Sequence, residues 1–299
     1  MKKNMERNPI IAESELIINP DGTIFHLHLH PEDIADSIIL VGDPGRVDMV
    51  AAHFDKGSVD CNVSSRELRT ITGRYNGKRV SVISTGMGTD NIDVVMTELD
   101  ALANMDFKKR QFRRDHRKLT VLRIGTCGAI RPEIPLGSYI FSRISAGFDS
   151  VLSWYEDGES ICDKSLEKAF IKYMKWPERF SAPYFVKASD VLSEKFKYLA
   201  IMGMTVSAPG FYGPQGRHVK LAPKIPDLIA KLEAFSYGDV RFTNIEMESS
   251  ALAGMARLMG HEAGTICLAV ANRYAKESNP DYKPLMETLV EKSLTILTE

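Results

Sequence analysis

Residues 119–128 read LTVLRIGTCG, and this stretch decides the fold class. Residues 119–124 are apolar apart from Thr120 and Arg123, which is typical of a buried strand, and the glycine-flanked residues 125–128 predict a loop at its carboxyl end. A guanidinium inside such a strand is costly unless an anion pairs with it. Arg123 therefore indicates either a structural ion pair with a carboxylate of the chain or a bound anion, to which Thr126 in the loop would add its hydroxyl and N–H.

Short apolar runs alternate with segments of helical periodicity on both sides of this stretch. Further strands are predicted at residues 37–41, 79–85, 138–142, 199–206, 241–245 and 264–271. Helices are predicted after Gly88, with Thr89 or Asp90 as N-cap, before Gly260, and over residues 284–297. This alternation predicts a mostly parallel, buried sheet covered by helices. Because no linker-like segment divides the chain, we expect a single α/β domain over residues 1–299, with 1–20 as an N-terminal extension.

The charge balance bears on the class of partner. Lys and Arg number 38 and Asp and Glu 39, a formal net charge of −1, which argues against a protein that coats nucleic acid. The basic stretch KKRQFRRDHRK at residues 108–118 is therefore interpreted as a solvated surface rather than a contact for nucleic acid or an acidic partner. Neither a signal peptide nor an apolar run of ~20 residues is found, so we expect no membrane partner.

The cysteines and histidines give little sign of a metal. The cysteines stand far apart, at positions 61, 127, 162 and 267, and predict reduced thiols in a cytoplasmic protein. His26, His28 and His30 alternate within FHLHLH, as ligands on one face of a strand would. Because no acid or thiol adjoins them, an exposed edge strand explains the pattern better, and we expect no metal site.

Candidate binding residues follow the predicted strands, where ligands of such sheets bind. Gly42 and Arg46 lie in the turn GDPGR, which offers backbone N–H groups and a guanidinium to a phosphate, although an ordinary turn with a surface arginine has the same sequence. Glu246 and Glu248 stand where a strand meets a helix. Their carboxylates suit the two hydroxyls of a sugar cis-diol, or they simply favour the helix dipole.

The loop FYGPQGR at residues 211–217 carries groups that suit a planar heterocycle. Phe211 would stack on it, Gln215 both donates and accepts and so matches an imide edge, and Arg217 would bind a carbonyl oxygen. The alternative is an exposed turn of the kind common in Pro/Gly loops.

Taken in order, these segments resemble the nucleoside phosphorylase-I superfamily. The matching stretches run from about Ile24 to the C-terminal helix and read FHLHL, VGDPGR, STGMG, LRIGTCGAI, GFYGPQGR, NIEMESSAL and VANR. The resemblance implies a single α/β domain whose central mixed sheet curls toward a barrel and is flanked by helices. It also implies a homodimer, or a hexamer built of dimers, in which the neighbouring subunit completes each active site.

The resemblance also implies a role for individual residues. The phosphate site would comprise Gly42, Arg46, Arg123, Thr126 and, from the neighbour, Arg66. Ribose would contact Met247, Glu248 and His26, with His26 reaching across the dimer. The base would meet Phe211, Gln215, Arg217 and Arg273. Of these residues, Arg123, Gln215, Arg217 and Glu248 would carry the catalysis; Glu246 belongs to the motif without an assigned role.

The implied reaction is the reversible phosphorolysis of uridine to uracil and ribose 1-phosphate, with phosphate as a substrate and no cofactor. A monovalent cation at the dimer interface would need Glu67, but Asn91 replaces the serine ligand of some relatives, which argues against it. A hydrolase of the same fold and a purine nucleoside phosphorylase are the alternatives. Three phosphate arginines oppose the first, and the lack of an Asp between Thr205 and Arg217 opposes the second. A catalytically silent binding protein is opposed by the complete set of pocket residues.

Overall fold

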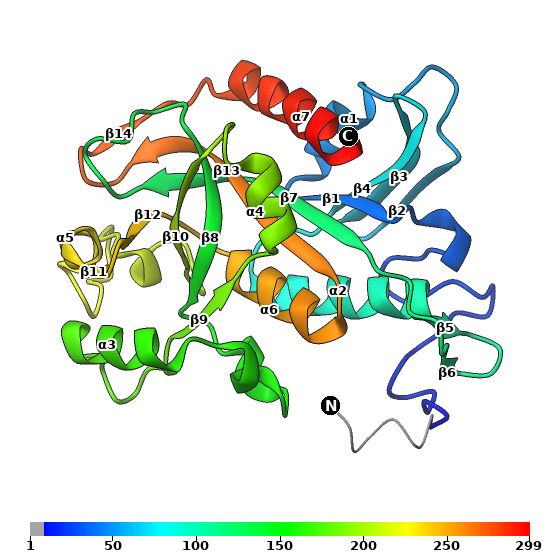
Figure 1. Cartoon of the computed structure of the whole chain (residues 1–299), viewed down its shortest axis with the longest axis horizontal. Helices are drawn as coiled ribbons and strands as arrows, with labels where there is room; N and C mark the ends of the chain where they lie inside the picture. Colours follow the sequence, from blue (N-terminus) through cyan, green and yellow to red (C-terminus); the bar gives the residue numbers. More distant parts are fainter. Residues whose placement is uncertain (1–8) are drawn as a thin grey trace.

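A mixed β-sheet forms the centre of the computed structural model, which describes residues 9–299 (Figure 1). Within that range the main sheet has twelve strands: β1 (Ser37–Val41), β2 (Cys61–Ser65), β3 (Leu68–Tyr75), β4 (Lys78–Ser84), β7 (Thr120–Ala129), β8 (Tyr139–Gly147), β9 (Tyr184–Lys187), β10 (Ile201–Ser207), β11 (Ser236–Tyr237), β12 (Val240–Glu246), β13 (Glu262–Asn272) and β14 (Glu277–Ser278). A separate hairpin joins β5 (Met105–Asp106) to β6 (Gln111–Phe112). The helices are α1 (Pro44–Ala51), α2 (Thr89–Asn104), α3 (Lys164–Met174), α4 (Asp190–Phe196), α5 (Leu228–Ala234), α6 (Ser249–Met259) and α7 (Lys283–Thr298).

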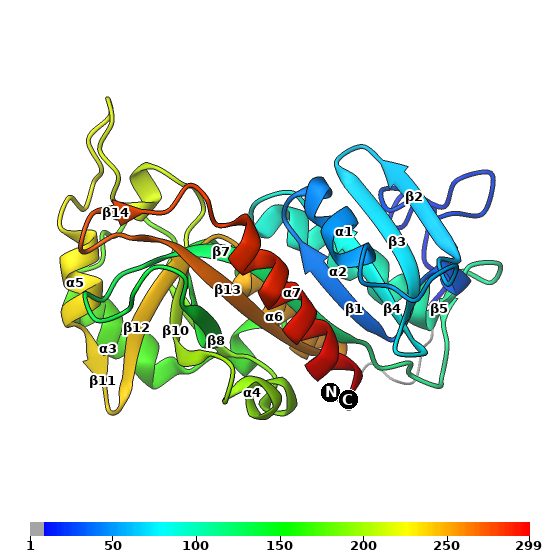
Figure 2. The same cartoon turned by 90° about the horizontal axis from the view of Figure 1, so that it is seen from above.

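One half of the sheet closes on itself. The hydrogen-bonded order runs β7, β13, β8, β10, β12, and β12 returns to β7 through the antiparallel pairs Asn244–Ala129 and Ile245–Gly128. The other half, β1, β4, β3 and β2, continues from β7 as an open sheet. The barrel-like half and the open half lie at opposite ends of the molecule in Figure 2. The fold class expected from the family resemblance, a mixed sheet curling toward a barrel, is confirmed.

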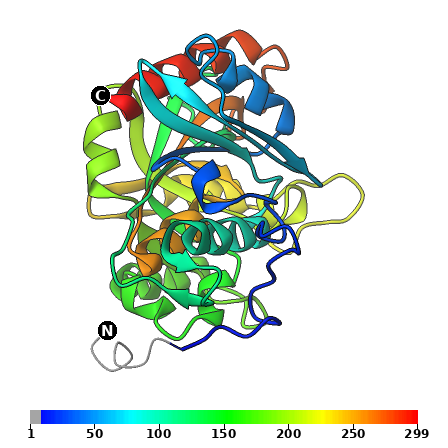
Figure 3. The ribbon, with the colours of Figure 1, turned by 90° about the vertical axis from the view of Figure 1, so that its right-hand side faces the viewer.

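The sheet is buried because its strands are apolar on both faces. In β1, Ile38 and Leu40 pack with α2 and α6, whereas Ile39 and Val41 pack with α1 and α7 on the opposite face. Figure 3 shows α2 and α7 on opposite sides of the open half. A third cluster of buried apolar side chains lies between the barrel strands and the helices α3 and α5. These layers leave the carboxyl ends of β1, β7 and β12 free to form a site.

Two predictions from the sequence around β7 and α2 are wrong. Residues 125–128 are not a loop, because β7 continues to Ala129 with β13 paired on one side and β12 on the other. Thr126 is therefore a half-buried strand residue. The N-cap of α2 is Gly88, with no side-chain capping bond from Thr89 or Asp90. The sheet is also more mixed than the alternation of strands and helices suggested, because β2, β3 and β4 are antiparallel.

The segment FHLHLH does not form the expected edge strand. Residues 25–30 adopt turns and irregular backbone, and the three histidines have separate surroundings. His26 contacts Glu98, and His28 contacts Asp21. Within residues 9–299, no group of three or more His, Cys, Asp or Glu side chains is placed to hold a metal ion.

The basic stretch at residues 108–118 lies on the surface, where it contacts residues 11–16; residues 1–8 of the expected N-terminal extension lie outside the described part of the chain. Arg110 donates to the backbone carbonyls of Ile11 (2.7 Å), Ala12 (3.0 Å) and Leu16. Arg117 pairs with Asp36. Several of its charges are thus used in structural contacts. Over the described residues, no helix is long and apolar enough to cross a membrane.

Candidate functional site

A cavity of about 550 Å³ opens at the carboxyl ends of β1, β7 and β12. We call it the site cavity. It is lined by Gly42, Asp43, Pro44, Arg46, Gly86, Met87, Arg123, Thr126, Cys127, Gly128, Phe211, Gln215, Arg217, Ile245, Glu246, Met247, Glu248, Val270 and Ala271. Most of the residues expected from the sequence to form phosphate, ribose and base sites therefore share one space, although they come from distant parts of the chain.

Two buried guanidiniums form one end of the site cavity. Arg46 stands in the first turn of α1 and donates from Nη1 to the backbone oxygen of Ile124 (3.2 Å). Burial lowers the pKa of Arg46, and the nearby positive charge of Arg123 lowers it further. Nε and Nη1 of Arg123 are buried without a hydrogen-bond partner among the described residues. Two neighbouring cations with donors left over are what a bound anion requires.

The backbone allows this close arrangement. A Cβ on Gly42 would lie 3.3 Å from the backbone oxygen of Gly86 and 3.8 Å from Nη2 of Arg123. Gly42 therefore keeps the end of β1 close to both neighbours. Asp43 caps α1 by accepting from the N–H of Gly45 (2.9 Å), which sets the direction of the first turn that carries Arg46.

Glu248 joins the guanidinium end to the middle of the site cavity. Its Oε2 lies 2.5 Å from Nη2 of Arg123, and its Oε1 accepts from the backbone N–H of Gly88 (2.9 Å). Burial raises the pKa of Glu248 to about 7, even though Arg123 favours the ionised form. Burial lowers the pKa of Arg123, but the negative charges of Glu248 and Glu246 outweigh this effect, so the pKa of the guanidinium is raised.

Glu246 connects the end of β10 to the start of α6, next to the contact between Arg123 and Glu248. Its carboxylate accepts from the hydroxyl of Ser207 (2.6 Å), from the hydroxyl (2.9 Å) and N–H (3.0 Å) of Ser249, and from the N–H of Glu248 (3.0 Å). It also lies 3.6 Å from Nη1 of Arg123. The second alternative, a role at the start of the helix, is confirmed for Glu246, whereas binding of a sugar diol stays a prediction. Glu246 satisfies the first N–H groups of α6, while Glu248 faces Arg123. The family resemblance alone assigned Glu246 no role, although Glu246 stands only two residues before Glu248.

The loop after β10 forms the opposite end of the site cavity. Gln215 is buried at the end of a short 3₁₀ turn, Gly213–Gln215, and Phe211 is half exposed. The Arg217 guanidinium carbon lies 3.7 Å from the centre of the Phe211 ring. Nη1 of Arg217 donates to the Phe211 backbone oxygen (2.6 Å) and to Oε1 of Gln215 (2.5 Å). Burial, together with the nearby positive charge of Arg273, lowers the pKa of Arg217 to about 10. The arginine therefore fixes the orientation of the Gln215 amide.

Three of the expected site residues do not line the site cavity of this chain. Arg273 packs against Gly128, where a Cβ would lie 2.8 Å from its Cγ. Arg66 is exposed in the turn between β2 and β3, with its guanidinium carbon 5.5 Å from the centre of the Phe25 ring. Nδ1 of His26 lies 2.7 Å from Oε1 of Glu98. Phe25 thus brings Arg66 and His26 into the same part of the surface.

Known proteins share this fold and sequence pattern. Residues 36–299 match the family model described as "Phosphorylase superfamily". A uridine phosphorylase of Thermococcus kodakarensis is 27% identical over 93% of this chain and 88% of its own. A purine nucleoside phosphorylase of Vibrio parahaemolyticus is 30% identical over 63% of this chain and 78% of its own.

Solved structures agree with the sequence comparison. A Trypanosoma brucei nucleoside phosphorylase, described as showing uridine phosphorylase activity, superposes with a TM-score of 0.84 at 28% identity. The match covers 94% of this chain and 98% of that one. With its barrel-like sheet and its matching residues spread over nearly the whole length, this chain belongs to the Phosphorylase superfamily.

Proposed function

We propose that the protein is a uridine phosphorylase, which converts uridine and phosphate to uracil and ribose 1-phosphate. The observation that carries the proposal is the pairing, within one cavity, of the buried guanidiniums of Arg46 and Arg123 with the amide of Gln215 at the opposite end. The names of the Thermococcus and Trypanosoma relatives agree with this assignment.

Phosphate binds at the guanidinium end. Nε and Nη1 of Arg123, which have no hydrogen-bond partner within the described residues, and the guanidinium of Arg46 bind its oxygens, with Thr126 as an additional donor. Phosphate is already an anion, so the arginines position it rather than activate it. One phosphate oxygen forms a bond to C1′ as the bond from C1′ to N1 of uracil breaks, which inverts the configuration at C1′. No side chain serves as the nucleophile, and no cofactor is needed.

Ribose lies between the two ends. The Glu248 carboxylate accepts hydrogen bonds from the ribose hydroxyls, and Met247 supplies an apolar contact. The transition state resembles an oxocarbenium ion, so a carboxylate close to the sugar ring also stabilises developing positive charge. Its contact with Arg123 holds Glu248 in place for this role.

Uracil is recognised by the loop after β10. Oε1 of Gln215 accepts from N3–H, the Gln215 NH₂ donates to one carbonyl, and Arg217 donates to a carbonyl. Negative charge develops on the leaving base, and these donors stabilise it as it forms. Arg273, whose charge reaches Arg217, supports the same end.

Each active site is proposed to use two subunits of a dimer or of a hexamer built of dimers. His26 and Arg66 lie near one another on the surface and outside the site cavity, which suits residues given to a neighbour. We expect the protein to act in pyrimidine salvage in the cytoplasm, where its four free cysteines stay reduced.

A nucleoside panel tests the proposed function. Uridine, deoxyuridine, thymidine, cytidine, inosine and guanosine are each incubated with the protein, with and without phosphate, and base release is followed by absorbance. Rapid uridine cleavage that requires phosphate supports the proposal. Cleavage without phosphate would identify a hydrolase, and preference for inosine or guanosine would identify a purine enzyme.

A further inference from the structure

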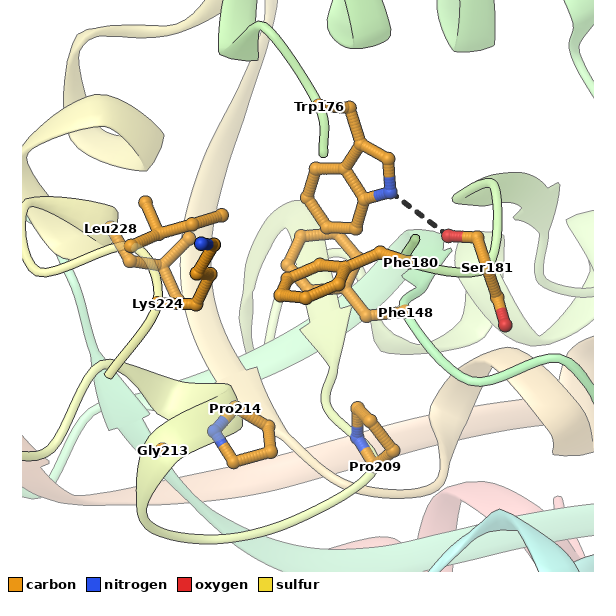
Figure 4. Close-up of a pocket in the computed structure, with 10 residues that line it drawn as sticks. Phe148, Trp176, Phe180, Ser181, Pro209, Gly213, Pro214, Lys224 and Leu228 are labelled. Carbon is orange, nitrogen blue, oxygen red and sulfur yellow. Dashed lines mark hydrogen bonds between the residues drawn. The ribbon is translucent and has the colours of Figure 1, made fainter. Parts of the chain in front are cut away.

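A second cavity, of about 370 Å³, lies behind the loop that closes the base end of the site cavity (Figure 4). Its walls come from three parts of the chain: the residue just after β8, residues 176–181 after α3, and residues 209–228, which run from the loop after β10 through the 3₁₀ turn to the start of α5. It is lined by Phe148, Trp176, Phe180, Ser181, Pro209, Gly213, Pro214, Lys224, Ile225 and Leu228. None of these residues lines the site cavity.

Aromatic rings form one wall of this second cavity. The ring centres of Phe148 and Trp176 are 4.8 Å apart, and those of Trp176 and Phe180 are 5.7 Å apart. The indole N–H of Trp176 donates to the backbone oxygen of Ser181 (2.9 Å), as Figure 4 shows. The only polar atom of the indole is thus already bonded, and the rings present apolar surface. A flat apolar ring system fits such a wall better than a sugar or an aliphatic chain.

Lys224 gives the cavity its charge. It is the only charged residue in the lining, and it stands with Leu228 across from the aromatic wall (Figure 4). Unlike Lys231, which pairs with Asp227 nearby, Lys224 makes no ion pair or hydrogen bond within the described part of the chain. The segment that carries it, just before α5, projects from the body of the protein in Figure 3. An unpaired ammonium at an aromatic cavity selects an anion.

The two cavities share a wall. Pro209, Gly213 and Pro214 face the second cavity, whereas Phe211 and Gln215 of the same loop face the site cavity. A Cβ on Gly210 would lie 3.1 Å from Cγ of Pro214, so the two ends of the loop are in close contact. A molecule packed against the prolines would therefore bias the conformation of the residues that bind the base.

We propose that the second cavity binds a planar aromatic carboxylate of one or two rings, with its rings against Phe148, Trp176 and Phe180 and its carboxylate on Lys224. The volume lies within the range of small-molecule sites, which are mostly apolar with a few placed polar groups. Occupancy changes the affinity for the nucleoside through the shared loop. This last effect rests on the proposed function, whereas the binding itself does not.

Calorimetric titration of the full-length protein tests the binding. Indole-3-acetate is compared with indole-3-acetamide, which has the same rings without the charge. We expect the acetate to bind at least tenfold more tightly than the acetamide, and Lys224→Met to remove that difference. Lys220→Met is the matched control, because Lys220 is exposed on the same segment but does not line the cavity. Ile225→Trp fills the cavity and should abolish binding of both compounds.

The location of the bound compound decides the outcome. Binding that survives saturating uracil but is lost in Ile225→Trp supports the proposal. No binding at millimolar concentration, or equal binding by wild type and both Lys224→Met and Ile225→Trp, overturns it. If Ile225→Trp fails to fold, Phe180→Ala tests the same wall at a position that is 40% exposed: it removes one ring and should weaken the binding of both compounds. The coupling is tested separately, by measuring whether indole-3-acetate changes the KM for uridine. The calorimetric titration needs no uridine activity, so it tests binding in the second cavity even if the proposed function is wrong.

Discussion

Nη2 of Arg123 lies 2.5 Å from Oε2 of Glu248, and both side chains are buried in the wall of the site cavity, between the proposed phosphate and ribose sites. The residue proposed to bind the phosphate anion is thus held by the residue proposed to bind the sugar. A change at either position should alter the use of both substrates. The contact also places a carboxylate beside the proposed phosphate site, so the protonation of Glu248 should affect phosphate binding.

Replacing Arg123 should abolish most of the activity. Arg123→Ala removes a preorganised charge donor and leaves Glu248 and Glu246 without their cation, so kcat/KM for phosphate should fall by ~10²-fold or more. Steady-state kinetics at varied phosphate measures this. Arg69→Ala is the control, because Arg69 pairs with the exposed Asp48 and lies outside the site cavity. Equal losses in the two variants would contradict a specific role for Arg123.

The raised pKa of Glu248 predicts a pH-dependent stability. The side chain has an ordinary pKa of 4.5 when unfolded and a pKa of about 7 in the native state. Between these values the native state retains a proton that the unfolded state releases, so the free energy of unfolding should fall as pH rises from about 4.5 to about 7.

Glu248→Gln isolates this contribution, because glutamine does not titrate. Denaturant unfolding of both proteins across the window should show a steeper loss of stability with pH in the wild type. Identical slopes would mean that Glu248 has the same pKa in the native and unfolded states. Phosphate should also bind more weakly to the wild type above pH 7 than below it, because the ionised Glu248 carboxylate repels the anion.

Gln215 should determine the choice of base. Uracil presents a donor at N3 between two acceptors, whereas cytosine has an acceptor at N3 and an amine at C4. A site built for one pattern can reject the other by ~10⁴-fold. Gln215→Ala should lower uridine kcat/KM and narrow the ratio of uridine to cytidine turnover. A variant that keeps the full ratio would show that discrimination lies elsewhere in the cavity.

Shared active sites predict complementation between inactive variants. Arg66→Ala and Glu248→Ala should each be nearly inactive alone. If Arg66 serves the neighbouring subunit, a mixed dimer contains one site with both defects and one intact site. Subunit exchange, verified by mass spectrometry, should therefore restore activity that neither parent shows. Mixed dimers that stay inactive would place Arg66 and Glu248 in the same site or give Arg66 no role.

The sequence predicted those helices and strands whose conformation depends on nearby residues rather than on pairing with distant strands. The strand at residues 37–41 and the helix ending at Gly260 were found because burial and a left-handed C-cap leave clear local signals. The extension of β7 beyond Gly125 was missed because it depends on pairing with β12, more than a hundred residues later. The hairpin β2–β3 was not predicted, since residues 61–65 alternate polar and weakly apolar side chains with little hydrophobic signal.

The same distinction applies to the site. Arg123 stood out because a charge in an apolar strand needs a partner, and Gln215 because its loop held several groups suited to a flat ring. The support that Glu246 gives through Ser207 and Ser249 joins segments some forty residues apart and could not be predicted from either. The position of His26 against Glu98 likewise depends on a distant helix.

The closure of the barrel through β7 and β12 has a consequence for how substrate preference could diverge. Arg123 and Glu246 stand on these two strands, inside the part of the sheet where every neighbour is fixed by pairing. Phe211, Gln215 and Arg217 stand instead on a loop outside the sheet, and Phe211 is half exposed. The two halves of the reaction are therefore modular. A loop from a purine-specific relative, grafted between Ser207 and Leu228, should change which base the protein accepts and leave the proposed phosphate site on β7 unaltered. Such chimeras are a starting point for engineering enzymes that make modified nucleosides.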